Sequence, residues 1–151
     1  MGRARVARTV DLPPARAFEL WTDLGRWRTF IDGFGHVDRV DAEWPAAGSK
    51  VVWRSIPSGR GVVTERVRAS EPGAMIETEV LEQRLVGTQT VEFAAAEGGG
   101  TEVAMSLDYK ALAGGPFGPL VDVLFIRRAQ GDALARTLRR FATEAAEEAA
   151  L

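Results

Sequence analysis

The sequence predicts a single soluble α+β domain in which a seven-stranded antiparallel sheet packs against one long C-terminal helix. Three observations support this class. The chain has 151 residues, which fits one ordinary domain. Its middle consists of short strand-like segments separated by turn residues, and its last quarter has an apolar repeat at helical spacing. We therefore treat residues 1–151 as one domain.

The chain begins with a strand over residues 3–10, where apolar and polar side chains alternate loosely. Asp11 then fits a helix cap, and the two prolines that follow stand where a first helical turn tolerates proline. We expect one short helix over residues 15–21 and, after a glycine, a second over residues 26–31.

Six further strands follow with short connections. The separators contain glycine or proline, as in residues 45–48 and 97–100, except between Leu81 and Val86. Such short loops favour consecutive antiparallel hairpins over crossover connections. The expected strands cover residues 36–44, 49–56, 61–70, 74–81, 86–95 and 101–111.

A long helix is expected over residues 116–149. A seven-stranded sheet cannot bury its apolar face alone, and this helix carries the longest apolar stripe in the chain. Gly131 lies inside it at a cost of about 1 kcal/mol relative to alanine, which indicates either a kink or a close approach to the sheet. The stripe consists of Phe117, Leu120, Val121, Leu124, Leu134, Leu138, Phe141 and Ala145.

Composition excludes several functional classes. The net charge of −2 comes from 19 basic and 21 acidic residues mixed along the chain, so neither nucleic acid nor an anionic membrane is an expected partner. No signal peptide and no apolar run of the ~20 residues that span a bilayer is present, so we expect a cytoplasmic protein without membrane insertion. The abundance of Ala, Arg and Gly suggests a bacterial origin.

The residues of the common metal and nucleophile sites are scarce. His36 is the only histidine and there is no cysteine, which excludes a zinc site with nitrogen or sulfur ligands. No Gly-x-Ser-x-Gly motif supplies a serine nucleophile, and the glycines at 98–100 form a hairpin turn and not a phosphate loop. We predict no metal and no cofactor.

The order of strand, two short helices, six strands and one long helix resembles the START-like (SRPBCC) superfamily, in particular its bacterial polyketide cyclase/dehydrase-like branch. Local marks are Val10-Asp-Leu-Pro-Pro-Ala-Arg-Ala-Phe18, Leu20-Trp-Thr-Asp-Leu24 and Gly99-Gly-Thr101. The resemblance covers essentially the whole chain. It implies a helix-grip fold, in which a curved sheet wraps around the long helix and leaves a cavity. Members bind lipids, sterols, polyketide intermediates or plant hormones, and a few are enzymes.

Large side chains near the expected cavity are candidates for ligand contacts, although aromatic residues more often fill ordinary cores. Arg128 lies about 40° from Leu124 on a helix, within the apolar stripe. We expect it either to bind a carboxylate, enolate or carbonyl of a ligand, or to pair with a carboxylate of the sheet; a small drift in helix phase would instead turn it outward. The ligand-binding candidates are Trp27, Phe30, Trp53, Phe117, Val121, Leu124, Phe125 and Arg128.

The candidates for acid–base chemistry are Glu65, Tyr109 and Arg128. If Val63 and Val67 face inward, Glu65 does too, since strand side chains repeat every two residues. An inward glutamate with a raised pKa suits a general base. The commoner alternative, for Glu65 as for the glutamates at 77 and 79, is a solvated face or an arginine partner.

Three functions remain open. The preferred one is binding or transport of a hydrophobic small molecule, lipid-like or polyketide-like, in an internal cavity. The second is a polyketide cyclase, aromatase or dehydratase that uses the same cavity and positions a reactive chain. The third is an interaction scaffold, which a fully packed interior would favour. The oligomeric state is open, with Ile126 a candidate homodimer contact.

Overall fold

The computed structural model describes residues 2–112 and 119–151, and the side chains of all of these except 119–125. The elements follow the predicted order, and the predicted α+β class is confirmed. The strands are β1 (Gly2–Val10), β2 (Phe34–Val40), β3 (Lys50–Ser55), β4 (Val62–Glu71), β5 (Met75–Leu81), β6 (Leu85–Ala95) and β7 (Thr101–Ala111). The helices are α1 (Pro14–Thr22), a short 3-10 turn η1 (Leu24–Arg26), α2 (Trp27–Phe30) and α3 (Pro119–Ala149), with a second 3-10 turn η2 (Glu97–Gly99) before β7.

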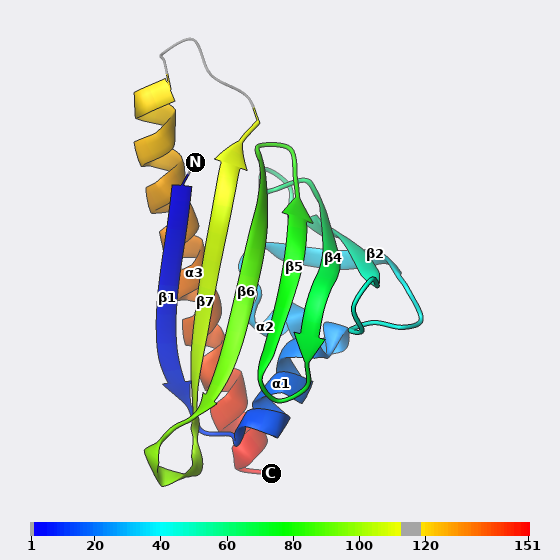
Figure 1. Cartoon of the computed structure of the whole chain (residues 1–151), viewed down its shortest axis with the longest axis vertical. Helices are drawn as coiled ribbons and strands as arrows, with labels where there is room; N and C mark the ends of the chain where they lie inside the picture. Colours follow the sequence, from blue (N-terminus) through cyan, green and yellow to red (C-terminus); the bar gives the residue numbers. More distant parts are fainter. Residues whose placement is uncertain (1, 113–118) are drawn as a thin grey trace.

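All seven strands form one antiparallel sheet in the order β1-β7-β6-β5-β4-β3-β2. The first strand pairs with the last along its whole length, from Gly2 opposite Tyr109 to Val10 opposite Thr101. Figure 1 shows α3 running behind β1 and β7, with α1 and α2 behind the lower ends of the other strands. The helices therefore share one face of the curved sheet, as the helix-grip fold requires.

Alternation along the strands decides which side chains face the helices. In β4, Val63, Glu65 and Val67 are buried, while Arg66 and Arg68 between and after them are exposed. Successive strand side chains point to opposite faces, so a polar residue in phase with the core enters the interior with it. Glu65 therefore points inward with Val63 and Val67, and the solvated-face alternative, which the sequence favoured, is wrong for this residue.

The buried stripe of α3 is formed by Leu134, Leu138, Phe141 and Ala145, at the three- and four-residue spacing of one helical face. The ring of Phe141 packs edge-on against Trp21 and Phe30, with ring centroids 5.1 and 5.0 Å apart. These contacts fix the position of α3 against the short helices at one end of the sheet.

One predicted strand boundary differs from the structure, and one of the two alternatives for Gly131 is excluded. The second strand was expected to reach Trp44 but ends at Val40, because the Asp41 carboxylate accepts the Lys50 amide at 2.9 Å and starts a turn. The Trp44 indole instead donates to the Thr22 carbonyl at 2.9 Å. Gly131 shows no close approach to the sheet, since no described atom outside its own helix backbone lies within 4 Å of where its Cβ would be.

Candidate functional site

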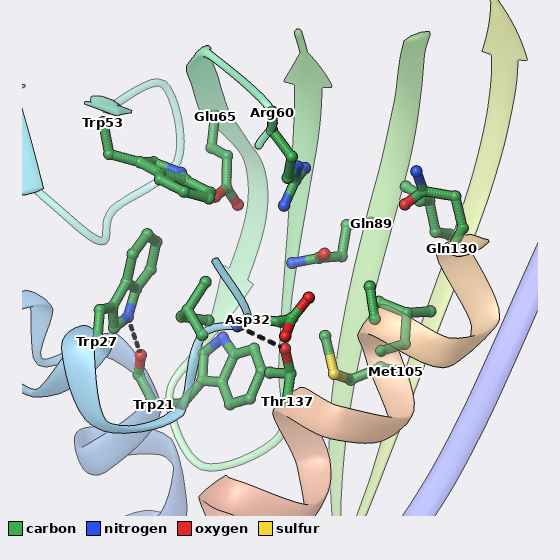
Figure 2. A pocket seen from close by; sticks show the side chains of 14 residues that line it. Trp21, Trp27, Asp32, Trp53, Arg60, Glu65, Gln89, Met105, Gln130 and Thr137 are labelled. Atoms are coloured by element: carbon green, nitrogen blue, oxygen red, sulfur yellow. Dashed lines mark hydrogen bonds between the residues drawn. The ribbon is translucent and has the colours of Figure 1, made fainter. Parts of the chain in front are cut away.

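An interior cavity of about 30 Å³ lies between the concave face of the sheet, the turn after α2 and the middle of α3. Figure 2 shows this cavity from close by. A water molecule needs about 10–15 Å³ of such space, so the cavity has room for about two or three waters. Its apolar lining is Trp21, Trp27, Ile31, Trp53, Met105, Leu107, Ala133 and Leu134, and its polar lining is Asp32, Arg60, Glu65, Gln89, Gln130 and Thr137.

Three tryptophans form one wall of the cavity. The Trp27 indole N–H donates to the Trp21 carbonyl at 2.7 Å, which fixes its ring. Its ring meets that of Trp53 edge to face, with centroids 6.3 Å apart. Trp27 and Trp53 are almost fully buried, so this wall is rigid and apolar.

Glu65 is the buried acid of the cavity. Its Oε2 accepts the Trp53 indole N–H at 2.8 Å, and its Oε1 accepts the Thr78 hydroxyl at 3.2 Å. Burial raises the pKa of Glu65 above its ordinary value; the hydrogen bond from Trp53 and the charge of Arg60 act in the opposite direction without cancelling the rise. The carboxyl group therefore has a fixed orientation, and burial makes its neutral form easier to keep than in a solvated glutamate.

The charge of Arg60 acts on the Glu65 carboxyl group. Arg60 lies in the turn between β3 and β4, and its guanidinium carbon stands 5.1 Å from the centre of the Trp53 ring. Its Nε donates to Oε2 of Glu82, whose side chain is only 3% exposed. The charge of Arg60 is therefore already balanced by a buried carboxylate.

A second polar group of the cavity ties the turn after α2 to α3, and we call it the Asp32 bridge. The Asp32 carboxylate accepts Arg136 Nε and Nη2 at 2.9 and 3.1 Å, and Arg140 Nη1 at 3.2 Å. The Asp32 amide donates to the Thr137 hydroxyl at 3.0 Å. Burial alone would raise the pKa of Asp32, but its hydrogen bonds and charge interactions with the two arginines lower it overall. Asp32 is therefore held ionised.

Gln89 completes the polar part of the lining from β6. It stands opposite Leu107 in the β6–β7 register and in phase with Val91 and Phe93, which are buried. Figure 2 shows the Glu65 carboxyl, the Arg60 guanidinium and the Gln89 amide gathered on one side of the cavity, with Asp32 and Thr137 across from them. Hydrogen-bonding groups thus converge on the sheet side of the cavity.

Tyr109 lies outside this cavity, on the same face of β7. It is 5% exposed, and within the described part of the chain its hydroxyl has no hydrogen-bond partner. Burial raises the pKa of Tyr109, and the positive charge of Arg127 offsets part of the rise. Its neighbours across both adjacent strands are Gly2 and Gly87, and a Cβ at Gly2 would stand 2.4 Å from its ring. Gly2 leaves the space that the tyrosine ring occupies, and Gly87 lies against the backbone of β7 at Asp108 and Tyr109.

The structure separates the predicted site residues. Trp27, Trp53 and Glu65 line the cavity, whereas Phe30 packs between Trp21 and Phe141 as a core residue. Arg128 is exposed on α3, beside a surface depression with Ala129, Asp132 and Arg136.

The inward orientation expected for Arg128 is therefore wrong, and the phase of α3 explains why. Counted from Leu134 at about 100° per residue, Arg128 lies about 120° around the helix, whereas Arg127 lies about 20° away. The sequence estimate used Leu124 as its reference, far from the part of α3 that packs on the core.

Four predicted ligand contacts are not among the described side chains. Phe117 lies outside the described residues, and the side chains of Val121, Leu124 and Phe125 belong to the first turns of α3, whose side chains are not described. Their roles remain predictions.

The remaining polar candidates are surface residues. His36 is exposed, and its Nε2 lies 3.0 Å from Asp38 Oδ1. Glu77 and Glu79 point away from the helices and lie 3.9 and 3.6 Å from Arg68. Across residues 2–112 and 119–151, no three acidic, histidine or cysteine side chains cluster as metal ligands would, and no helix is long and apolar enough to cross a membrane.

Comparison with known families decides the classification of this fold and cavity. The family described as "Polyketide cyclase / dehydrase and lipid transport" matches residues 1–146, nearly the whole chain. The chain belongs to this family. No curated protein matches its sequence.

Solved structures agree with this assignment. A START superfamily protein from Mycobacterium smegmatis superposes with a TM-score of 0.77 at 10% identity, covering 97% of this chain and 99% of that one. A protein of Thermus thermophilus gives 0.72 at 17% identity, with coverage of 97% and 98%. A protein of Deinococcus radiodurans gives 0.61 at 25% identity, with coverage of 94% and 95%. These similarities support a START-like fold for this member of the family.

Sequence reasoning missed Arg60, Asp32 and Gln89. The sequence does contain a signal for Gln89. It lies on the same strand face as Val91 and Phe93, just as Glu65 lies on the same face as Val63 and Val67. Arg60 and Asp32 lie in turns, where no periodicity assigns a direction to the side chain.

Proposed function

We propose that this protein binds a hydrophobic small molecule that carries a polar group, within the cavity between the sheet and α3. The observation that supports this most directly is the division of the lining: a tryptophan wall on one side, and the converging Glu65, Arg60 and Gln89 side chains on another. Ligand sites combine apolar walls with a few placed polar groups in this way. The family's description, which includes lipid transport, agrees with such a role.

The present volume of about 30 Å³ admits water but no lipid-sized ligand. Binding therefore requires the cavity to enlarge. The Asp32 bridge crosses from the turn after α2 to α3 beside the cavity, and its arginine side chains are 42% and 46% exposed. Exposed ion pairs of this kind are weak, so separation of this turn from α3 is an inexpensive way to open the site.

Native mass spectrometry of the freshly purified protein tests the proposal, followed by organic extraction and identification of any bound molecule. The proposal expects an apolar molecule in one-to-one ratio, or saturable binding when fatty acids, aromatic ketones and other apolar compounds are added. A protein that emerges empty and binds no compound of such a panel would contradict it.

A second candidate function is an enzyme of the cyclase or dehydratase type, and the cavity offers one observation in its favour. Glu65 and Asp32 line the same cavity, and their surroundings shift the two pKa values in opposite directions. Carboxyl groups whose pKa values are pushed apart serve as acid and base in many enzymes. Incubation with a poly-β-ketone thioester tests this candidate: faster cyclisation than in buffer, lost in Glu65→Gln, would support it.

The small volume of the cavity favours the third candidate, an interaction scaffold. A nearly filled interior needs no ligand to be stable. The ligand panel separates the two ideas, because a scaffold would bind none of the compounds, and its thermal unfolding temperature would not rise when they are added.

A further inference from the structure

The polar side of the cavity contains one buried carboxyl group, that of Glu65, whose pKa is raised by burial. Glu65 is 6% exposed, and each of its oxygens already accepts one side-chain hydrogen bond, from Trp53 or from Thr78. A carboxyl group has about four acceptor positions, and its acid form also carries a donor. Glu65 lines the cavity, so it retains the capacity to bind a ligand atom there.

Among the side chains that the structure describes, the charges around Glu65 leave no free cation for an anionic ligand. Arg60 forms an ion pair with the buried Glu82, and Asp32 across the cavity is paired with two arginines of α3. The other polar groups of the lining, from β6 and α3, are the neutral side chains of Gln89, Gln130 and Thr137.

A ligand carboxylate placed in this cavity would therefore meet Glu65 and Asp32, with only one described guanidinium in the lining, whose charge is already balanced by Glu82. Burial of a carboxylate without its own counter-charge is strongly unfavourable. Burial raises the pKa of Glu65, which agrees with a site where the neutral acid persists. A ligand oxygen that accepts a hydrogen bond without bringing a charge suits these surroundings.

We propose that the cavity selects ligands whose polar end is a neutral carbonyl, such as a ketone, ester or amide, and discriminates against free carboxylates. Glu65 in its acid form donates a hydrogen bond to the carbonyl oxygen, and the Gln89 amide supplies a second donor. The inference rests on the proposed binding function and names the ligand class of that same cavity.

A matched pair of probes tests this selectivity. 2-Acetylnaphthalene and naphthalene-2-carboxylate have the same ring and nearly the same size, and at about pH 7 only the second is ionised. Affinities are measured by calorimetry, and the four tryptophan indole N–H signals are followed by NMR. The Trp53 signal reports on the site because this N–H donates to Glu65.

Three variants accompany the wild type. Glu65→Gln keeps a neutral donor at this position, Glu65→Leu removes it, and Glu79→Gln changes an exposed glutamate on the opposite face of the sheet as the control. We expect the ketone to bind at least about tenfold more tightly than the carboxylate, and Glu65→Leu to lose about tenfold for the ketone, as removal of one buried hydrogen bond predicts. Glu79→Gln should stay within about twofold of the wild type, and Glu65→Gln should restore most of the ketone affinity that Glu65→Leu loses.

Tighter binding of the carboxylate than of the ketone, or equal binding of the two, would overturn this inference while leaving the binding function intact. Ketone affinity unchanged in a folded Glu65→Leu would overturn the role of Glu65. If neither probe binds, and none of the fatty acids, aromatic ketones and other apolar compounds binds either, the proposed binding function is wrong. The proposed selectivity for carbonyl groups is then wrong as well.

Discussion

The indole nitrogen of Trp53 lies 2.8 Å from Oε2 of Glu65, and both side chains are buried. The two residues come from neighbouring strands, where Trp53 pairs with Val63 and Glu65 pairs with Val51, so they are diagonal neighbours on the concave face. Side chains in this relation lie within reach of each other when one is a large aromatic ring. The pair gives the cavity a carboxyl group of fixed orientation beside an apolar wall.

The first prediction concerns the pH dependence of stability. The pKa of Glu65 is raised in the folded protein, so below about 4.5, the ordinary value, both folded and unfolded chains hold the proton. As the pH rises above this value, the unfolded chain releases its proton before the folded one does, and the free energy of unfolding falls. Glu65→Gln removes this dependence. Urea unfolding followed by tryptophan fluorescence should therefore show Glu65→Gln gaining stability relative to the wild type as the pH rises above about 4.5.

The contribution of Asp32 has the opposite sign and does not obscure this comparison. Its pKa is lowered in the folded state, so its stabilisation is present above its ordinary value of 3.8 and is lost only as the pH falls through the folded pKa. Parallel pH profiles for the wild type and Glu65→Gln would contradict the proposed protonation of Glu65.

The second prediction concerns the ion pair of Arg60 with Glu82. Arg60→Met leaves a buried carboxylate without its partner, and we expect it to lower the free energy of unfolding by about 2–3 kcal/mol. The double variant Arg60→Met/Glu82→Gln removes the unpaired charge and should recover most of this loss. The measurement is urea unfolding of the three proteins. If Arg60→Met is as stable as the wild type, the ion pair with Glu82 does not balance the charge of Arg60.

The third prediction concerns the Asp32 bridge. Arg136→Ala should speed the entry and release of an apolar probe, because it removes two of the three arginine hydrogen bonds that hold the turn after α2 to α3. The free energy of unfolding should fall by less than about 1 kcal/mol, as for other exposed ion pairs. Stopped-flow fluorescence with N-phenyl-1-naphthylamine gives the rates. Arg139→Ala, on the exposed side of α3, is the control and should leave them unchanged.

If Arg136→Ala and Arg139→Ala bind and release the probe at the wild-type rates, the ligand does not enter beside the Asp32 bridge.

The fourth prediction concerns two glycines with opposite surroundings. A Cβ at Gly87 would lie 2.6 Å from the Asp108 carbonyl oxygen, so Gly87→Ala should destabilise the protein by about 1–3 kcal/mol. Gly131 lies within α3 with open space around it, so Gly131→Ala should stabilise the protein by about 0.5–1 kcal/mol. Thermal unfolding should show a lower unfolding temperature for Gly87→Ala and a higher one for Gly131→Ala than for the wild type. Destabilisation by Gly131→Ala would contradict the packing described for α3.

The fold was predictable because periodicity determines which face of each element is buried. The two-residue period put Glu65 in phase with Val63 and Val67, although the sequence alone favoured a solvated face for it, and the stripe of Leu134, Leu138 and Phe141 identified the buried face of α3. Turn residues then separated the strands in the correct order, apart from the end of β2.

The site was less predictable because four of the six polar residues that line it come from turns or from the long helix α3, whose rotation decides which side chains face inward. Arg60 and Asp32 acquire their directions from tertiary ion pairs with Glu82 and Arg136, which no local pattern contains. Arg128 was placed by counting from the first turns of α3, and a count from Leu134 turns it outward.

The central claim, binding inside this cavity, is tested most directly by a pair of alanines on α3. Ala133 lines the cavity and Ala135 is exposed, so Ala133→Phe fills the site and Ala135→Phe does not. N-phenyl-1-naphthylamine is titrated into the wild type and both variants, and its fluorescence is recorded. We expect saturable binding to the wild type and to Ala135→Phe, and its loss in a folded Ala133→Phe. Equal binding to all three proteins, or no binding to the wild type, would contradict the account.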